Sequence, residues 1–443
     1  MLSEKIKIML DINSFHNILV VGYGVSGKSV HEFLKNKGFR VFVYDDKDEK
    51  APDKISDINW SEIDLVIKSP AIPFMDHNCH PVIKQANDHE IPVISTFDVF
   101  RIYHPGAKII AITGTNGKST TTALTYHILK KAGFSVEMGG NVGIPYFDLP
   151  KAEWYVFEMS SYELASSKYL DFEIACILNI EPDHMEIHGS FENYIEAKHL
   201  ALDHAKLRLI SYEDHYSMSK YAKQEKVITI STEYEPKADI YVCENAILNR
   251  VSNRVAIDLS GILNLRGKHN YQNIEFAYAI CKNLGLQSRE IINHVMSFTP
   301  LPHRLNTVRK IGDVLFVNDS KATNPGSAAR ALATFFGYKI YWLVGGRSKK
   351  TDPMIYIKDH LSGVQKVYLF GESMDEFEKT FDGIKKTIRC QTMENALKAA
   401  YKDAAMEKGP SVVLLSPMCA SFDQYKSFEH RGEEFVKMVE SLK

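Results

Sequence analysis

The chain has 443 residues, 45% hydrophobic and 24% charged, which is enough for about three ordinary globular domains. Its 53 Lys and Arg residues nearly balance its 55 Asp and Glu residues, and the net charge of -2 excludes a generally basic nucleic-acid-binding protein. No run approaches the roughly 18 apolar residues of a membrane span and the N-terminus lacks the apolar segment of a secretion signal, so we expect a cytoplasmic protein that binds neither nucleic acid nor membrane.

Short apolar runs alternate with stretches of helical period through most of the chain. This alternation predicts an α/β fold built on parallel sheets. Proline-containing stretches interrupt the alternation at residues 103–106 and 299–302. We therefore predict three domains, over residues 1–104, 105–300 and 301–443.

A glycine-rich turn separates the first predicted strand, residues 17–22, from a helix predicted to begin at about Gly27. Residues 22–27 match GxGxxG, and Asp45 ends the next strand, where a ribose-binding acid is expected. Glycines here allow backbone N–H groups to approach a diphosphate at the helix N-terminus. The motif leaves three interpretations open: a dinucleotide cofactor such as NAD, another nucleoside diphosphate, or a structural tight turn.

A second glycine loop, GTNGKST at residues 114–120, follows an apolar strand at 109–113 and precedes a helix. Loop N–H groups and the helix dipole would face a phosphate, Lys118 would reach the outer phosphates, and Ser119 could bind Mg²⁺. Ile112 stands where the strict motif has glycine, so this is a variant phosphate loop.

Acidic and imidazole side chains follow the next two apolar strands. Glu158 ends one of them, and Glu181, Asp183 and His184 follow the other. A carboxylate at a strand tip beside a phosphate loop is a common Mg²⁺ ligand, although Glu158 could also be a surface cap. Lys198, taken alone, indicates only a solvated helical lysine.

In the last predicted domain, polar segments follow the strands at residues 318–325, 345–350 and 416–425. Ligands of open parallel sheets bind beyond the carboxyl ends of the strands, so we expect these segments to face one site.

These motifs, in this order, resemble the Mur ligases of peptidoglycan synthesis over nearly the whole chain. The resemblance is carried by residues 114–120, 158–161, 179–184, 267–270 and 301–304. Residues 318–324 and 416–428, followed by Arg431-Gly432, resemble the branch of the family that adds D-glutamate. The DNPR sequence of the branch that adds a diamino acid is absent.

The resemblance implies an ATP-dependent ligase that adds D-glutamate to UDP-N-acetylmuramoyl-L-alanine through an acyl phosphate, in cell-wall precursor synthesis. It implies an N-terminal Rossmann-like UDP-binding domain, a central P-loop ATPase-like domain and a C-terminal Rossmann-like amino-acid-binding domain, in a monomer. The implied cofactors are ATP and two Mg²⁺ ions. A family member that adds another amino acid and an NAD-dependent dehydrogenase are the alternatives.

The resemblance also implies residue roles. The catalytic residues would be Lys118, His184, a carbamylated Lys198 and Lys321. The ATP site would comprise Gly114, Thr115, Asn116, Gly117, Lys118, Ser119, Thr120, Asn270, Asn273, Arg304 and Asp319. The UDP-linked substrate would contact Val25, Ser26, Gly27, Asp45, Asp46, Asn141, Ser160 and His184. D-Glutamate would contact Lys321, Thr323, Lys349, Ser421 and Phe428, and the metal ligands would be Ser119, Glu158, His184 and Lys198. Arg347 and Ala71 depart from the family pattern and leave the neighbouring nucleotide and UDP-sugar contacts open.

Overall fold

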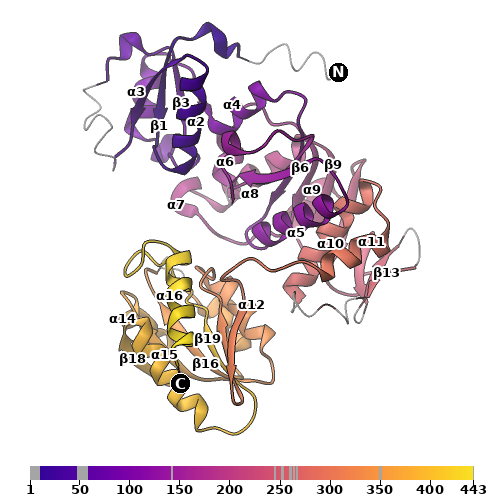
Figure 1. Ribbon diagram of the computed structural model, residues 1–443, viewed down its shortest axis with the longest axis vertical. Coiled ribbons are helices and arrows are strands. Elements are labelled where there is room, and N and C mark those ends of the chain that lie inside the picture. The colour runs from indigo at the N-terminus through magenta and orange to yellow at the C-terminus, as the bar shows by residue number, and fades with distance from the viewer. Residues whose placement is uncertain are drawn as a thin grey trace. The chain divides into compact units, whose positions relative to one another are not determined.

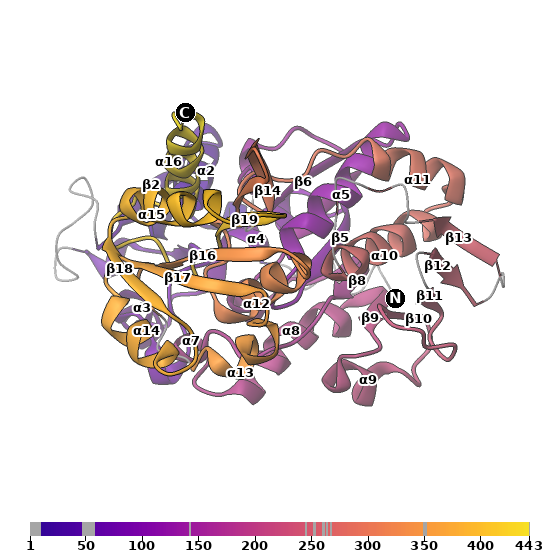
Figure 2. The ribbon, with the colours of Figure 1, turned by 90° about the horizontal axis from the view of Figure 1, so that it is seen from below.

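The computed structural model describes residues 10–46, 58–140, 143–243, 246–250, 254–258, 262, 265, 268–348 and 352–442. The chain forms two compact units, one of residues 1–263 and 270–298 and the other of residues 264–269 and 299–443. Both units are α/β, as the alternation of apolar runs predicts, and Figures 1 and 2 show their elements from two directions. None of the helices in the described ranges combines the length and apolar composition needed to cross a membrane.

The first sheet consists of four parallel strands in the order β2-β1-β3-β4. Their bounds are Asn17–Val21 (β1), Arg40–Tyr44 (β2), Leu65–Lys68 (β3) and Val93–Ser95 (β4). The associated helices are α2 (Val25–Asn36), α3 (Pro81–Asp88) and α4 (Thr96–Tyr103). Alternate residues of β1 enter two separate apolar clusters, because a parallel sheet covered by helices is buried on both faces.

The helix predicted from about Gly27 is α2, which begins two residues earlier, at Val25, with Gly24 as its N-cap. Gly27 lies inside the helix. A Cβ there would approach Gly22 O to 1.9 Å, so glycine is required by close packing of the helix on the turn.

The second sheet, also in the first unit, has nine described strands in the order β13-β12-β11-β10-β9-β8-β5-β7-β6. The strands are Lys108–Thr113 (β5), Val136–Gly140 (β6), Trp154–Glu158 (β7), Phe172–Ile177 (β8), Ala205–Ser211 (β9), Val227–Ser231 (β10), Ile240–Cys243 (β11), Ala246–Asn249 (β12) and Arg254–Asp258 (β13). The helices are Lys118–Lys131 (α5), Ser161–Ser166 (α6), Met185–His188 (α7), Phe191–Asp203 (α8), His215–Tyr221 (α9), Lys268–Asn283 (α10) and Ser288–Met296 (α11). β5 lies between β7 and β8 and is parallel to both, so the loop that follows β5 is flanked by the carboxyl ends of two neighbours.

The first sheet is anchored to the second within the first unit. Ser29 Oγ donates to Asp148 Oδ1 at 2.9 Å, and Phe33 stacks on Phe147 with ring centroids 4.4 Å apart. The buried Asp98 carboxylate accepts two backbone N–H bonds, from residues 168 and 169, at 2.7 and 2.8 Å.

The second unit contains a sheet in the order β14-β15-β19-β16-β17-β18, in which β14 alone among the described strands is antiparallel to its neighbour. The strands are Asn306–Ile311 (β14), Val314–Asn318 (β15), Lys339–Gly345 (β16), Val364–Phe370 (β17), Thr387–Gln391 (β18) and Ser411–Leu415 (β19). The helices are Pro325–Thr334 (α12), Met354–Ile357 (α13), Met374–Phe381 (α14), Met393–Ala405 (α15) and Phe428–Glu440 (α16). β15, β19 and β16 are adjacent and parallel, so their carboxyl ends meet at one edge.

Short 3₁₀ helices cover Ile12–Ser14, Trp60–Glu62, Asp76–Asn78, Tyr146–Asp148 and Lys358–His360. The structure has two compact units and three described sheets. The division of the chain into three domains at residues 104 and 300 stays a prediction.

Candidate functional site

The loop between β5 and α5 has the backbone geometry of a phosphate-binding turn. Gly114 and Gly117 adopt φ of +148° and +89°, which side-chain-bearing residues rarely reach. Gly117 is the N-cap of α5 and makes no side-chain capping bond, so it leaves the N–H groups of the first helical turn to other acceptors. These N–H groups and the helix dipole favour an anion at this position.

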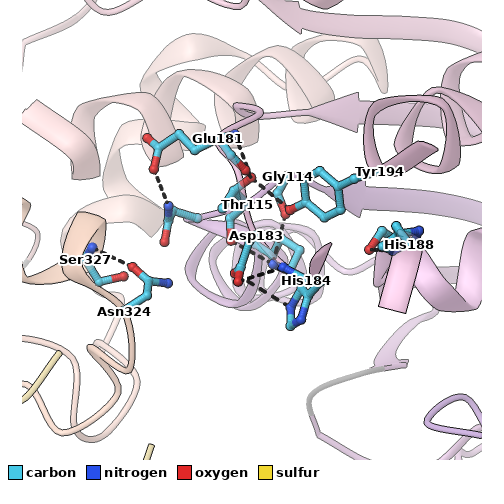
Figure 3. A network of polar contacts seen from close by, with 12 residues as sticks. Gly114, Thr115, Glu181, Asp183, His184, His188, Tyr194, Asn324 and Ser327 are labelled. Atoms are coloured by element: carbon cyan, nitrogen blue, oxygen red, sulfur yellow. Dashed lines mark hydrogen bonds and ion pairs between the residues drawn. The ribbon is translucent and has the colours of Figure 1, made fainter. Parts of the chain in front are cut away.

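Segments that follow β8 hold this loop in place. The Asn116 backbone N–H donates to Asn179 Oδ1 at 2.8 Å, and the Asn116 amide donates to Glu181 Oε2 at 3.0 Å. Thr115 Oγ1 donates to the Glu181 carbonyl at 3.0 Å and lies 2.9 Å from Tyr194 Oη (Figure 3). The sequence does not predict that Asn179 and Tyr194 hold the loop, because their pairing with it spans more than 60 residues.

Two of the predicted catalytic lysines meet at one carbonyl. Lys118 Nζ donates to Gly114 O at 2.9 Å and to Thr115 O at 3.0 Å, while Lys198 Nζ donates to Gly114 O at 2.8 Å. Lys198 is 1% exposed and lies over the Tyr194 ring, 4.7 Å from its centroid. Burial, followed by the charge of Lys118, holds the pKa of Lys198 well below its usual value.

Oxygen ligands suited to Mg²⁺ flank the loop. Strand register places Glu158, 2% exposed, opposite Ile112 at the base of the loop, and Ser119 lies buried in the first turn of α5. Within the described ranges, no cluster of three or more His, Cys, Asp or Glu side chains could hold a metal by itself. One hydroxyl and one carboxylate fit a Mg²⁺ ion that takes its other ligands from phosphate and water.

His184 lies at the end of the segment that fixes the loop. Its backbone is left-handed, with φ of 58°, and its N–H donates to Asp183 Oδ1 at 3.0 Å. The ring Nε2 lies 3.7 Å from Asp183 Oδ2 (Figure 3). The ring also meets Tyr162 edge to face. Ser160 is buried and caps α6 by accepting from Glu163 N at 3.2 Å.

The predicted adenine contacts lie beside the phosphate loop. Asn273 Nδ2 donates to Asn270 Oδ1 at 3.0 Å, and Asn273 Oδ1 accepts from Thr121 Oγ1 at 3.0 Å. The amide of Asn273 therefore connects α10 to the first turns of α5.

In the first sheet, the predicted UDP contacts gather around the GxGxxG turn. The Tyr23 N–H donates to Asp45 Oδ2 at 2.6 Å, and His80 Nε2 lies 3.1 Å from Asp46 Oδ2. Val25 and Ser26 open α2, whose N-cap Gly24 makes no side-chain capping bond. The order of the four described strands, β2-β1-β3-β4, differs from the 3-2-1-4-5-6 order of the dinucleotide-binding fold. This observation disfavours the NAD interpretation.

In the second unit, Lys321 and Phe428 are in contact, with Lys321 Nζ 3.8 Å from the ring centroid. The Thr323 N–H donates to Lys321 O at 2.8 Å, and Ser421 is buried. Arg347, which departs from the family pattern, forms a two-pronged ion pair with Glu372 at 3.0 Å for each contact.

Asp319 is buried at the end of β15. Its Oδ2 accepts from Ser416 Oγ at 2.8 Å and its Oδ1 from Leu305 N at 3.3 Å. Burial raises the pKa of Asp319 to about 7, against the opposing effect of these hydrogen bonds and of the Arg304 charge. Arg304, Asp319 and Lys321 belong to the second unit, and the phosphate-loop residues belong to the first. Asn141, Gly267 and Lys349 lie outside the described residues.

Two family models match the chain: the Mur ligase middle domain over residues 112–281 and the Mur ligase, glutamate ligase domain over residues 303–419. A Rickettsia bellii (strain RML369-C) protein named UDP-N-acetylmuramoylalanine--D-glutamate ligase is 34% identical, with 98% of this chain and 99% of that protein covered. A Rhizobium meliloti (strain 1021) protein of the same name is 34% identical, with 98% of each covered.

Solved structures share the fold. UDP-N-acetylmuramate-alanine ligase of Thermotoga maritima has a TM-score of 0.63 at 18% identity, covering 96% of this chain and 100% of that one. A Thermotoga maritima MurF ligase in complex with ADP has a TM-score of 0.59 at 19% identity, covering 98% of each. Since named ligases match nearly the full length at 34% identity and the two family models together cover more than half of the chain, the chain belongs to the Mur ligase family.

Proposed function

We propose that the protein joins D-glutamate to UDP-N-acetylmuramoyl-L-alanine with hydrolysis of ATP, as a cytoplasmic monomer of three domains, 1–104, 105–300 and 301–443. The observation that carries the proposal is the convergence of Lys118 and Lys198 on the Gly114 carbonyl of a phosphate loop. The relatives named above bear the name of this reaction.

The chemistry requires an activated acid, because a carboxylate is a poor electrophile. ATP would transfer its γ-phosphoryl group to the alanine carboxylate, and the amine of D-glutamate would displace phosphate from the acyl phosphate. Every reactant is anionic, so catalysis depends on fixed positive charge and in-line positioning. Lys118 would stabilise charge that develops on the transferring group.

Ser119 and Glu158 would hold one Mg²⁺ ion, and His184 with a modified Lys198 would hold a second. Bound Mg²⁺ neutralises phosphate oxygens. Only a neutral amine adds CO₂ to give a carbamate and a proton, and the lowered pKa of Lys198 increases that neutral fraction. The carbamate would also replace the repulsion between Lys198 and Lys118 with an attraction.

The other predicted site residues are grouped by the ligand that each would contact. The turn at residues 22–27, with Asp45, Asp46, Asn141 and Ser160, would bind the UDP-linked substrate. Asn270, Asn273, Arg304 and Asp319 would contact ATP, and Lys321, Thr323, Lys349, Ser421 and Phe428 would bind D-glutamate. A dicarboxylate needs a cation and several donors, which this last set supplies.

The test measures phosphate release from ATP in the presence of Mg²⁺ and UDP-N-acetylmuramoyl-L-alanine, with D-glutamate, L-alanine, meso-diaminopimelate or L-lysine as acceptor. We expect release with D-glutamate alone among the four. Equal release without any acceptor, or faster release with another amino acid, would refute the assignment.

A further inference from the structure

Arg431, in the first turn of α16, connects three loops of the second unit. Its Nε donates to Ser320 Oγ at 2.9 Å and its Nη2 to Ser320 O at 2.8 Å. Nη2 also donates to Cys419 O at 3.0 Å, and Nη1 to Gly345 O at 3.5 Å. These acceptors follow or end the adjacent parallel strands β15, β19 and β16.

Two of these loops, those after β15 and β19, carry described residues that are proposed to bind the amino-acid acceptor. Ser320 precedes Lys321, whose ammonium group lies over the Phe428 ring, and Cys419 lies two residues before Ser421. Ser320 Oγ in turn donates to Phe428 O at 2.8 Å. One hydrogen bond therefore joins the guanidinium group to Ser320, the chain neighbour of Lys321, and a second joins Ser320 to Phe428.

The next residue fixes this arrangement. A Cβ on Gly432 would lie 2.3 Å from His303 Nδ1, so only glycine lets α16 approach this closely. Gly432 O accepts from Asn318 Nδ2 at 2.9 Å. The first turn of α16 is therefore docked directly on the end of β15.

The position of Arg431 is costly for folding. Its side chain is 0% exposed, and its hydrogen-bond partners in the described part of the chain are hydroxyl and carbonyl oxygens, not carboxylates. The helix dipole also disfavours a cation in the first turn. Burial lowers the pKa of Arg431 to about 10, although Cys419, Asp423, Tyr425 and Asp319 act in the opposite direction, so it remains charged at neutral pH.

We propose that Arg431 is a positioning residue of the acceptor site, whose guanidinium group fixes the β15, β16 and β19 loops in the arrangement that binds an amino-acid dicarboxylate. This inference rests on the proposed function and adds a residue that does not itself touch the acceptor. The proposed role requires both the charge of Arg431 and the forked geometry of its guanidinium group. Lysine keeps the charge but does not reproduce the fork.

Arg309 offers a matched control in the same unit. It is exposed and donates through Nη1 to the carbonyls of residues 439, 440 and 442, at the other end of α16. If Arg431 only stabilised α16, as Arg309 does at the other end of the helix, its replacement should lower the thermal midpoint without changing any KM.

The experiment measures KM for D-glutamate, ATP and UDP-N-acetylmuramoyl-L-alanine, with the thermal midpoint, for Arg431→Lys, Arg431→Gln and Arg309→Gln. We expect KM for D-glutamate to rise on the order of tenfold in Arg431→Lys and further in Arg431→Gln, because charge-assisted hydrogen bonds are lost. The other two KM values should stay within about twofold. Arg309→Gln should lower the thermal midpoint and leave all three KM values unchanged.

An unchanged KM for D-glutamate in the Arg431 variants, or an equal rise in all three KM values, would overturn the inference. Should Arg431→Gln fail to fold, Ser320→Ala removes one partner and keeps the charge; we expect a rise of a few fold in KM for D-glutamate alone, and no rise would equally overturn the inference. If the wild-type protein used another acceptor, the proposed function would be refuted but the inference about Arg431 would not. The Arg431 variants would then be expected to raise KM for that other acceptor.

Discussion

Gly117→Ala should damage both the folding of the phosphate loop and the binding of ATP. A left-handed backbone costs a residue with a Cβ about 1–2 kcal/mol. The added Cβ would lie 2.6 Å from Asn273 Oδ1, so the amide must move and lose the 3.0 Å bond from Thr121 Oγ1, worth about 1 kcal/mol. We expect a loss of roughly 2–3 kcal/mol of unfolding free energy and an ATP Kd raised on the order of tenfold or more.

Gly133→Ala is the control, because Gly133 follows the same helix with φ of +86° and its Cβ would meet nothing within 4 Å. It should cost only the backbone strain of about 1–2 kcal/mol and leave the ATP Kd unchanged. Denaturant unfolding gives the stabilities and titration calorimetry gives the Kd values. Equal ATP affinities in the two variants would contradict the proposed position of the phosphates at this loop.

Three further predictions concern the ionisable side chains of Lys118, Lys198 and Glu163. Lys118→Ala should reduce turnover roughly a hundredfold to a thousandfold in the phosphate-release assay, whereas Lys131→Ala, on the exposed last turn of α5, should have no effect. Lys198→Ala should be inactive and regain activity with a short carboxylic acid but not with bicarbonate; full activity of the variant would exclude the carbamate. Burial raises the pKa of Glu163 to about 7, above its usual 4.5, so the folded state holds the proton more tightly and stability should fall as pH rises from about 4.5 to 7. Glu163→Gln should make the thermal midpoint less dependent on pH over this range. An unchanged pH dependence would assign the effect to other groups.

The local parts of the fold could be predicted from the sequence, since each depends on neighbouring residues. The strand predicted at 109–113 is β5, and the glycines of the loop after it adopt the positive φ that such a turn requires. The alternation of apolar runs and helical stretches predicted the α/β class. Contacts such as Thr115 with Tyr194 join residues 79 apart, and one sequence carries no pattern that pairs them.

The burial of Lys198 has a signature in the sequence of its own helix. Taken alone, Lys198 indicates a solvated helical lysine, and that prediction is wrong because the side chain is 1% exposed. Tyr194, Ala197, Ala201 and Leu202 are buried on the same helix, at the 3.6-residue spacing of an apolar face that includes position 198. A lysine on the apolar face of an amphipathic helix is itself evidence of a special environment.

Each of the three sheets has a buried basic residue near the carboxyl ends of its strands. Lys68 ends β3 at 2% exposure, Lys198 binds the loop after β5 at 1%, and Arg431 binds the loops after β15 and β19 at 0%. Burial lowers the pKa of Lys68 to about 8 despite the nearby charges of Glu163 and Asp98. Removing such groups from water opposes folding, and nearby carboxylates offset only part of that cost. The proposed ligands at the first and third of these edges, a diphosphate and a dicarboxylate, are anions, so their binding would compensate the charges of Lys68 and Arg431. At the second edge the proposed carbamate would instead replace the positive charge of Lys198 with a negative one.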